Sequence, residues 1–243
     1  MKIAIISDIH GNEEALIEVL MSIEREKIEK IICLGDIVGY GPNPNECVEI
    51  IKSLENCICL AGNHDWAAIG KVDIRTFNRV AREAIIWTQR KLIDENKKYL
   101  NSLPLTYSEY NALFVHASPL NPEKWNYIIS VKDARIAFQE FTEQVCFIGH
   151  THYPFVLKKR EREIYNIENL EKVQLESSSK YLINVGSVGQ PRDRNNKSSY
   201  GIFDVDKRIF YLKRVPYPIK KVQAKILEAG LDPLLSARLD IGT

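Results

Sequence analysis

Acidic residues and histidines recur in short polar turns that follow apolar runs. The first such turn contains Asp8-x-His10 and begins at Ser7, directly after the apolar residues 3–6. Four apolar residues in a row, rich in β-branched side chains, predict a strand buried on both faces. Because side chains alternate along a strand, we expect Asp8 and His10 to share one side of its carboxyl end. Such a pair can bind a cation, although alone it is also typical of an ordinary polar loop.

The same arrangement recurs further along the chain. All five histidines follow predicted strands in turns that contain Gly or Asp, and Asp36 and Asn63 occupy equivalent places. These histidines are His10, His64, His116, His150 and His152. A set of His, Asp and Asn without Cys suits a divalent ion such as Mn²⁺, Fe²⁺ or Zn²⁺. It is too large for one zinc, which takes about four ligands. Two metal ions that share one bridging carboxylate fit the set.

The elements that must position these residues alternate along the chain. Strands are predicted at 3–6, 30–34 and 57–61, with helices at 13–26 and 44–54 between them. This alternation predicts a parallel sheet with right-handed crossovers, whose ligand site lies beyond the carboxyl ends of the strands. Two helices within 73–102, a strand at 112–115, a helix at 131–141 and a strand at 145–148 follow.

The pattern changes after residue 154. Short strands are predicted at 155–160, 163–166, 181–185, 199–204 and 208–215, and the polar turns between them favour antiparallel pairing. A closing helix at 219–229 ends at Gly230. No linker-like segment divides the chain. We therefore expect one domain over residues 1–243, of the α/β (α+β) class, with two sheets face to face and helices outside.

Composition narrows the function classes. The 243 residues are 45% hydrophobic and 27% charged, as in an ordinary globular protein. A net charge of +1 without a basic tract argues against a nucleic-acid partner such as a nuclease would need. No apolar run is long enough for a membrane span, so we expect no membrane partner. Five cysteines without Cys-x-x-Cys spacing indicate buried thiols and a cytoplasmic location.

Five sequence blocks, taken in order, resemble those of the calcineurin-like metallophosphoesterases. The blocks are Asp8-x-His10, Gly35-Asp36, Gly62-Asn63-His64-Asp65, His116 and Gly149-His150-x-His152. The resemblance extends from residue 3 to about residue 204. It implies a two-sheet β-sandwich flanked by helices, in four layers ordered αββα.

The resemblance also implies a role for each residue. Asp8, His10 and His152 would bind one metal ion and Asn63, His116 and His150 a second, with Asp36 as the bridge. His64 would lie near the leaving-group oxygen and protonate it or stabilise its charge; alternatively it holds a metal ligand in place. Two cations about 3.5–4 Å apart can share a hydroxide that attacks phosphorus. Manganese is the expected metal, with iron and zinc as alternatives.

The second block departs from two branches of the family. Protein Ser/Thr phosphatases and symmetrical dinucleoside tetraphosphatases carry Gly-Asp-x-Val-Asp-Arg-Gly, whereas this chain has Gly39 and Tyr40 in place of the second Asp and the Arg. The chain looks more like the small bacterial and archaeal phosphodiesterase-like branch. Arg192 is our first candidate for binding phosphate, because a guanidinium group binds phosphate bidentately. The alternative is that Arg192 is an ordinary arginine of a surface loop. Asn12 and Asn63 are further substrate-binding candidates, and Asn12 would also cap a helix.

The main hypothesis is a dinuclear metal-dependent phosphoesterase. It would hydrolyse phosphodiester or phosphoanhydride bonds of a small phosphorylated substrate, with nucleotides among the candidates. Tyr40 and Trp66 could stack a nucleobase or pack as a lid. The alternatives are a phosphomonoesterase of small metabolites and a non-catalytic metal-binding scaffold, since a fold does not determine function. Homo-oligomer formation is left open.

Overall fold

Two six-stranded mixed sheets form the frame of the protein. The structure is a computed structural model that describes residues 1–28 and 30–243. The first sheet has the order β3-β2-β1-β11-β12-β9. Its strands are β1 Lys2–Ile6, β2 Lys30–Cys33, β3 Cys57–Cys59, β9 Val173–Gln174, β11 Ser198–Asp204 and β12 Ile209–Val215. β1, β2 and β3 are parallel, whereas β11, β12 and β9 pair antiparallel with their neighbours.

The second sheet has the order β4-β5-β6-β10-β7-β8. Its strands are β4 Thr106–Glu109, β5 Ala112–Val115, β6 Val145–Ile148, β7 Phe155–Arg160, β8 Glu163–Asn166 and β10 Lys180–Asn184. β5, β6 and β10 are parallel to one another. β4, β7 and β8 pair antiparallel with their neighbours. Each sheet therefore contains a parallel group that can present loops at one edge.

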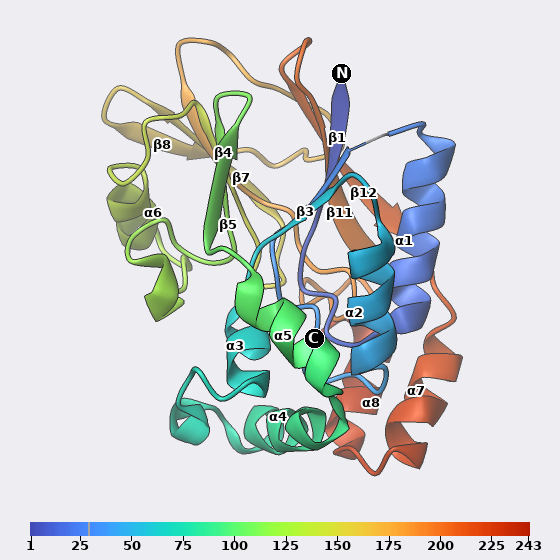
Figure 1. Cartoon of the computed structure of the whole chain (residues 1–243). Helices are drawn as coiled ribbons and strands as arrows, with labels where there is room; N and C mark the ends of the chain where they lie inside the picture. Colours follow the sequence, from blue (N-terminus) through green and yellow to red (C-terminus); the bar gives the residue numbers. More distant parts are fainter. Residues whose placement is uncertain (29) are drawn as a thin grey trace.

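Helices cover the outer faces of the two sheets (Figure 1). Their bounds are α1 Glu13–Arg25, α2 Pro44–Ser53, α3 Asn63–Ala68, α4 Arg79–Lys91, α5 Asp94–Ser102, α6 Val131–Ala137, α7 Ile219–Glu228 and α8 Pro233–Ile241, with short 3₁₀ turns at Ile74–Thr76 and Pro122–Lys124. In this view α1 and α2 lie beside the first sheet and α6 beside the second, while α3, α4, α5, α7 and α8 gather at the lower end, toward which β1 runs. The predicted sandwich with helices outside is confirmed.

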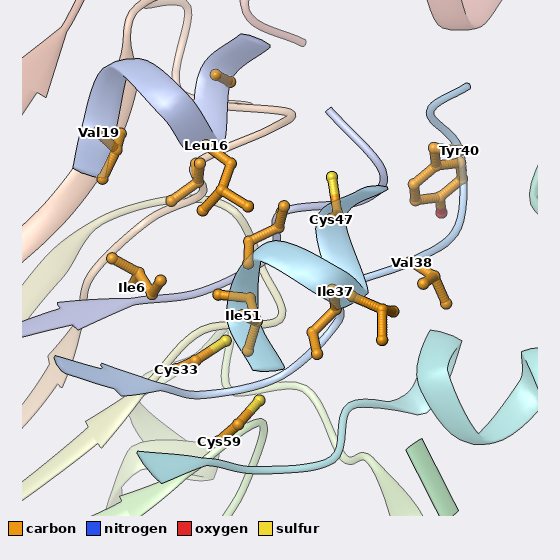
Figure 2. Packing of buried hydrophobic residues seen from close by; sticks show 14 of the residues in the cluster. Ile6, Leu16, Val19, Cys33, Ile37, Val38, Tyr40, Cys47, Ile51 and Cys59 are labelled. Carbon is orange, nitrogen blue, oxygen red and sulfur yellow. The ribbon is translucent and has the colours of Figure 1, made fainter. Parts of the chain in front are cut away.

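Apolar side chains fill the spaces between these layers. Ile3 and Ile5 of β1 point into the core between the two sheets, whereas Ala4 and Ile6 face the helices. The strand is thus buried on both faces, as its apolar run predicted. Figure 2 shows the second of these cores, where Leu16 of α1 and Ile6 pack with side chains from α2. The core shared by both sheets supports our proposal of one domain over residues 1–243.

The structure contains elements that the sequence patterns did not predict: β4, β9, α3 and α8. β4 has no continuous apolar face and forms by pairing with β5. Antiparallel pairing after residue 154 is confirmed for β7–β8 and β11–β12, whereas for β10 it is wrong in part, because β10 also pairs parallel with β6. Within the described residues, no helix has the length and apolar character that crossing a membrane requires.

Candidate metal centre

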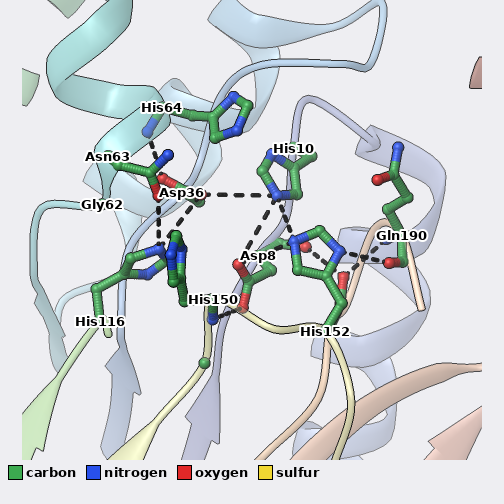
Figure 3. Close-up of polar contacts among 12 residues, drawn as sticks. Asp8, His10, Asp36, Gly62, Asn63, His64, His116, His150, His152 and Gln190 are labelled. Carbon is green, nitrogen blue, oxygen red and sulfur yellow. Dashed lines mark hydrogen bonds and ion pairs between the residues drawn. The ribbon is translucent and has the colours of Figure 1, made fainter. Parts of the chain in front are cut away.

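The residues predicted to do chemistry meet beyond one end of the two sheets (Figure 3). They come from the segments that follow β1, β2 and β3 of the first sheet and β5 and β6 of the second, and Asn63 and His64 are the first residues of α3. The structure brings all eight together, and none is more than 7% exposed. These residues are Asp8, His10, Asp36, Asn63, His64, His116, His150 and His152. Their position matches the rule that ligands bind beyond the carboxyl ends of parallel strands.

Asp8, His10 and His152 form a first group whose ligating atoms could hold a cation. Nδ1 of His10 lies 3.1 Å from the carbonyl oxygen of Val38, and Nδ1 of His152 lies 2.6 Å from that of Gln190. A carbonyl oxygen only accepts, so each Nδ1 carries the proton and each Nε2 presents a lone pair. The two Nε2 atoms are 2.9 Å apart, and they lie 3.7 and 3.2 Å from Oδ1 of Asp8. Three electron-rich atoms this close favour a cation among them.

Asp36, His116 and His150 form a second group of this kind. Nε2 of His116 lies 3.3 Å from Oδ2 of Asp36 and 3.2 Å from Oδ1 of Asn63. The backbone N–H of His150 donates to Oδ2 of Asp8 at 2.9 Å. This hydrogen bond joins the second group to the carboxylate of the first.

The carboxylate of Asp36 lies between the two groups. Its Oδ2 is 3.7 Å from Nε2 of His10 and 3.3 Å from Nε2 of His116. Its Oδ1 accepts a hydrogen bond of 2.7 Å from the backbone N–H of His64. One oxygen is therefore held by the first turn of α3 while the other faces both groups. This placement suits a carboxylate that bridges two cations.

Left-handed backbone conformations direct these side chains. The φ angles are 56° at Asp8, 52° at His10, 53° at Asp36, 65° at His150 and 59° at His152. We predicted from the alternation of side chains along a strand that Asp8 and His10 share one side. This reason is wrong, because β1 already ends at Ile6. Non-glycine residues rarely adopt this conformation, and those that do cluster at functional sites. Hydrogen bonds from Asp8 N–H to the Gly35 carbonyl (3.0 Å) and from His10 N–H to the Asp36 carbonyl (2.9 Å) hold the turns.

The surroundings keep both carboxylates ionised. Burial opposes ionisation of Asp8, but the neighbouring His152 and His10 outweigh it and hold the pKa of Asp8 well below its usual range. Burial also opposes ionisation of Asp36, and the nearby His116 and His64 in turn lower the pKa of Asp36. Two ionised carboxylates in a buried site are stable only beside positive charge.

Most of the imidazoles are neutral in this environment. Burial lowers the pKa of His150 and that of His152 to about 3 and carries the pKa of His64 well below its usual range. His116 differs: burial opposes its protonation, but the charge of Asp36 raises the pKa of His116 to about 9. Neutral imidazoles offer lone pairs, which is the form in which histidine binds metals.

The donor set fits divalent cations. Among the described residues, Oδ1 of Asp8 and Nε2 of His150 are buried and accept no hydrogen bond. A buried polar atom without a partner is costly, and a cation would give both atoms one. Imidazole, carboxylate and amide donors without thiolate suit ions such as Mn²⁺, Fe²⁺ or Zn²⁺. Asp8, His10 and His152 could hold one such ion, and Asp36 with His116, His150 and Asn63 could hold another.

The predicted substrate-binding residues are placed differently from one another. The guanidinium of Arg192 is half-buried, 5.6 Å from the ring centre of Tyr40, whose ring packs against the histidines. Arg192 therefore flanks the candidate centre. Oδ1 of Asn12 accepts from Ala15 N–H at 3.1 Å, and its Nδ2 donates to the Gly189 carbonyl at 2.8 Å. The expected helix cap is confirmed, and the use of both polar atoms within the protein favours this structural role over substrate contact.

Asp65 is a positioning residue that the sequence reasoning left without a role. Its carboxylate accepts hydrogen bonds from the N–H groups of Asp36 (2.8 Å), Gly62 (2.9 Å) and Val38 (3.2 Å). These contacts fasten the loop after β2 to the loop after β3. The signal was present, because Asp65 stands beside His64 in the third block of the resemblance.

Two further residues of the surroundings had weaker signals. The ring of Tyr127 stacks on that of His150 with the ring centres 4.0 Å apart and half of its side chain exposed. Its only signal was an aromatic side chain in a loop after a strand. Trp66, a candidate for stacking a base, instead packs edge-on against Trp125 with the ring centres 5.3 Å apart.

A helix-flanked double sheet with a buried His and Asp centre at its loop edge defines a class, the metal-dependent phosphoester hydrolases. The profile of the calcineurin-like phosphoesterase superfamily domain matches residues 1–208. The chain belongs to this family, and the resemblance found in its sequence blocks is confirmed.

Proteins similar to this chain in sequence or in structure come from archaea and bacteria. An uncharacterized protein of Methanocaldococcus jannaschii is 45% identical over 250 residues, covering 99% of this chain and 98% of the relative. The crystal structure of a metallophosphoesterase from Sphaerobacter thermophilus has a TM-score of 0.87 at 42% identity, covering 100% of this chain and 99% of that one. A symmetrical bis(5′-nucleosyl)-tetraphosphatase of Aliivibrio fischeri is 30% identical over 136 residues, which is 54% of this chain and 49% of that protein.

Proposed function

We propose that the protein is a dinuclear phosphoesterase that hydrolyses phosphodiester or phosphoanhydride bonds of a small phosphorylated substrate. The observation that carries this proposal is the position of Asp36, with Oδ2 3.7 Å from His10 Nε2 and 3.3 Å from His116 Nε2. A carboxylate oxygen that faces two separate groups of donors suits two cations better than one. When bound, paired divalent cations neutralise phosphate oxygens and make water acidic enough to act as a nucleophile near neutral pH.

We assign His64 to the leaving-group side of the reaction. Its backbone is fixed by the 2.7 Å hydrogen bond to Asp36, and its ring packs between those of Tyr40 and Phe77. Because burial lowers the pKa of His64, the ring is neutral at pH 7 and carries one N–H. A neutral N–H can donate a hydrogen bond to the developing negative charge on the leaving oxygen, as donors in other active sites do. This environment favours charge stabilisation over full proton transfer by His64.

The finer identity of the substrate is part of the same proposal. One relative is a symmetrical bis(5′-nucleosyl)-tetraphosphatase, but it matches only 54% of this chain. We infer a nucleotide-like substrate, with Arg192 at the flank of the centre as a phosphate contact. We also keep manganese as the expected metal and the cytoplasm as the expected location; the latter depends on the five cysteines, all of which are free.

Metal content and hydrolysis, measured together, test the proposal. The purified chain is loaded in turn with Mn²⁺, Fe²⁺ and Zn²⁺, its bound metal is counted by mass spectrometry, and hydrolysis of bis-p-nitrophenyl phosphate is compared with that of p-nitrophenyl phosphate. We expect two metal ions per chain and faster hydrolysis of the diester. Faster hydrolysis of the monoester would indicate a phosphomonoesterase. No bound metal and no turnover after loading would refute the enzyme and leave a scaffold.

A further inference from the structure

Two arginines from distant parts of the chain meet at one side-chain oxygen. Nη2 of Arg192 donates to Oε1 of Gln190 at 2.7 Å, and Nη1 of Arg238 from α8 donates to the same oxygen at 3.2 Å. The carbonyl oxygen of Gln190 also receives the Nδ1–H of His152 at 2.6 Å, and Figure 3 shows Gln190 beside His152. One residue therefore joins the arginine pair to the candidate metal centre.

No side-chain carboxylate in residues 1–28 and 30–243 forms an ion pair with either arginine. Asp193, next in sequence to Arg192, pairs with Arg214 instead. Nε of Arg238 donates to the main-chain oxygen of Thr243 at 2.6 Å, and Nε of Arg192 is buried without a partner among the described atoms. Both side chains are only partly exposed. Two neighbouring guanidinium groups that share one neutral side-chain acceptor, with Nε of Arg192 unpaired, form a place where an anion is favoured.

The pair lies close enough to the centre to act on the same substrate molecule. The guanidinium of Arg192 is 5.6 Å from the ring centre of Tyr40, and that ring is 4.7 Å from His10 and 4.5 Å from His64. An anionic group attached to a phosphoryl group at the centre would therefore lie beside this pair.

We propose that Arg192 and Arg238 bind a second phosphate group, adjacent to the one that is hydrolysed. This inference rests on the proposed function and makes it narrower: the substrate contains a pyrophosphate linkage, as in a nucleoside or dinucleoside polyphosphate. Guanidinium groups bind phosphate oxygens through paired N–H donors, and two of them suit a group with more than one negative charge. Arg238 lies outside the matched family domain of residues 1–208, so the helices α7 and α8 supply this specificity.

Binding of inorganic pyrophosphate and orthophosphate to the full chain tests this pair directly. Isothermal titration calorimetry is run on wild type, Arg238→Gln and Arg238→Lys, each with and without Mn²⁺. Loss of one charge-assisted hydrogen-bonding group should weaken pyrophosphate binding about tenfold or more, with a smaller effect on orthophosphate. Arg238→Lys keeps the positive charge but lacks the planar guanidinium group, so its affinity for pyrophosphate should lie between those of wild type and Arg238→Gln. Lys220→Gln is the matched control, because Lys220 pairs with Asp240 on the same pair of helices and is 82% exposed.

Kinetics supply the second measurement. In Arg238→Gln, the kcat/KM for diadenosine tetraphosphate relative to that for bis-p-nitrophenyl phosphate should fall about tenfold, mainly through a higher KM. An unchanged ratio together with wild-type pyrophosphate affinity in Arg238→Gln would overturn the inference while leaving the proposed function intact. If wild type hydrolyses neither compound with any metal, the proposed function fails, and calorimetry still decides whether the pair binds pyrophosphate. Should Arg238→Gln fail to fold, Arg238→Lys decides alone.

Discussion

Replacing Gly39 with alanine tests whether His64 acts on the substrate. Gly39 has a φ of +93°, and a Cβ added there would lie 2.6 Å from Nδ1 of His64 and 3.1 Å from its Cγ. Ordinary contacts begin at 3.4 Å, so the shortfall from 3.4 to 2.6 Å requires Nδ1 to move by about 0.8 Å. Gly39 stands where the two branches named above carry the second Asp of the block.

The size of the kinetic effect follows from this displacement. A catalytic group that is misplaced by about 1 Å can cost about 100-fold in rate, so we expect kcat for bis-p-nitrophenyl phosphate to fall about 10- to 100-fold. Alanine in a left-handed conformation also lowers the free energy of unfolding by about 1 to 2 kcal/mol. Bound manganese, counted by mass spectrometry, should stay at the wild-type level if His64 is not a ligand.

Gly70→Ala is the matched control for this change. Gly70 has a φ of +79°, and a Cβ there meets no atom within 4 Å. Both variants should lose stability in urea unfolding because of the left-handed conformation, Gly39→Ala more so because of its contact with His64, but only Gly39→Ala should lose kcat. If the effect acts through His64, the double variant with His64→Asn will be no slower than His64→Asn alone. Additive losses in the double variant, or a wild-type kcat in Gly39→Ala, would refute the reasoning.

Three further changes test the centre and its support. Asp36→Asn removes the charge between the two groups, and we expect nearly all turnover to be lost while circular dichroism shows a folded chain; wild-type rates would exclude a bridging role. His64→Asn should lower kcat about 100-fold with bound metal unchanged, and a loss of metal would make His64 a ligand. Lys225→Met removes the 2.6 Å ion pair to the buried Glu14 and should lower the free energy of unfolding in urea by about 1 to 3 kcal/mol at pH 7. Burial opposes ionisation of Glu14, but Lys225 and Lys221 outweigh it and lower the pKa of Glu14. The ion pair therefore stabilises the fold fully above pH 4.5, and this stabilisation is lost as the pH falls through the folded-state pKa of Glu14. If Lys225→Met lowers the free energy of unfolding equally at pH 3 and at pH 7, this reasoning is wrong.

The buried strands could be predicted because each is an uninterrupted apolar run. The predicted ranges 112–115 and 145–148 coincide with β5 and β6, and 30–34 differs from β2 by one residue. Placing the histidines after these strands is also a local feature of the sequence. Parallel topology then brings loops that are distant in sequence to one edge of the sheets. The grouping of the candidate ligands followed from these two facts.

Other features depend on contacts that no local pattern encodes. α3 begins at Asn63, inside a block expected to be a turn, and its first turn is held by the carboxylates of Asp65 and Asp36. α8 did carry local signals, since Asp232 caps it and Pro233 opens it. The apolar side chains of α8 are spread around the helix, so its sequence shows no apolar stripe from which a helix could be predicted. The position of Arg238 beside Gln190 follows only from how α7 and α8 pack.

The left-handed residues of the centre are where local reasoning fails most clearly. Each costs about 1 to 3 kcal/mol in a non-glycine residue, so the surrounding loops must fix these conformations. They do so by direct contacts: the carbonyl oxygen of Asp8 accepts hydrogen bonds from Gly189 N–H at 2.9 Å and from Oγ of Ser187 at 2.8 Å. Gly62 and Gly149 leave room for the acids, because a Cβ at either position would overlap the carboxylate of Asp36 or Asp8. These contacts preorganise the ligand directions, which lowers the part of the free energy of cation binding that is needed to order the loops.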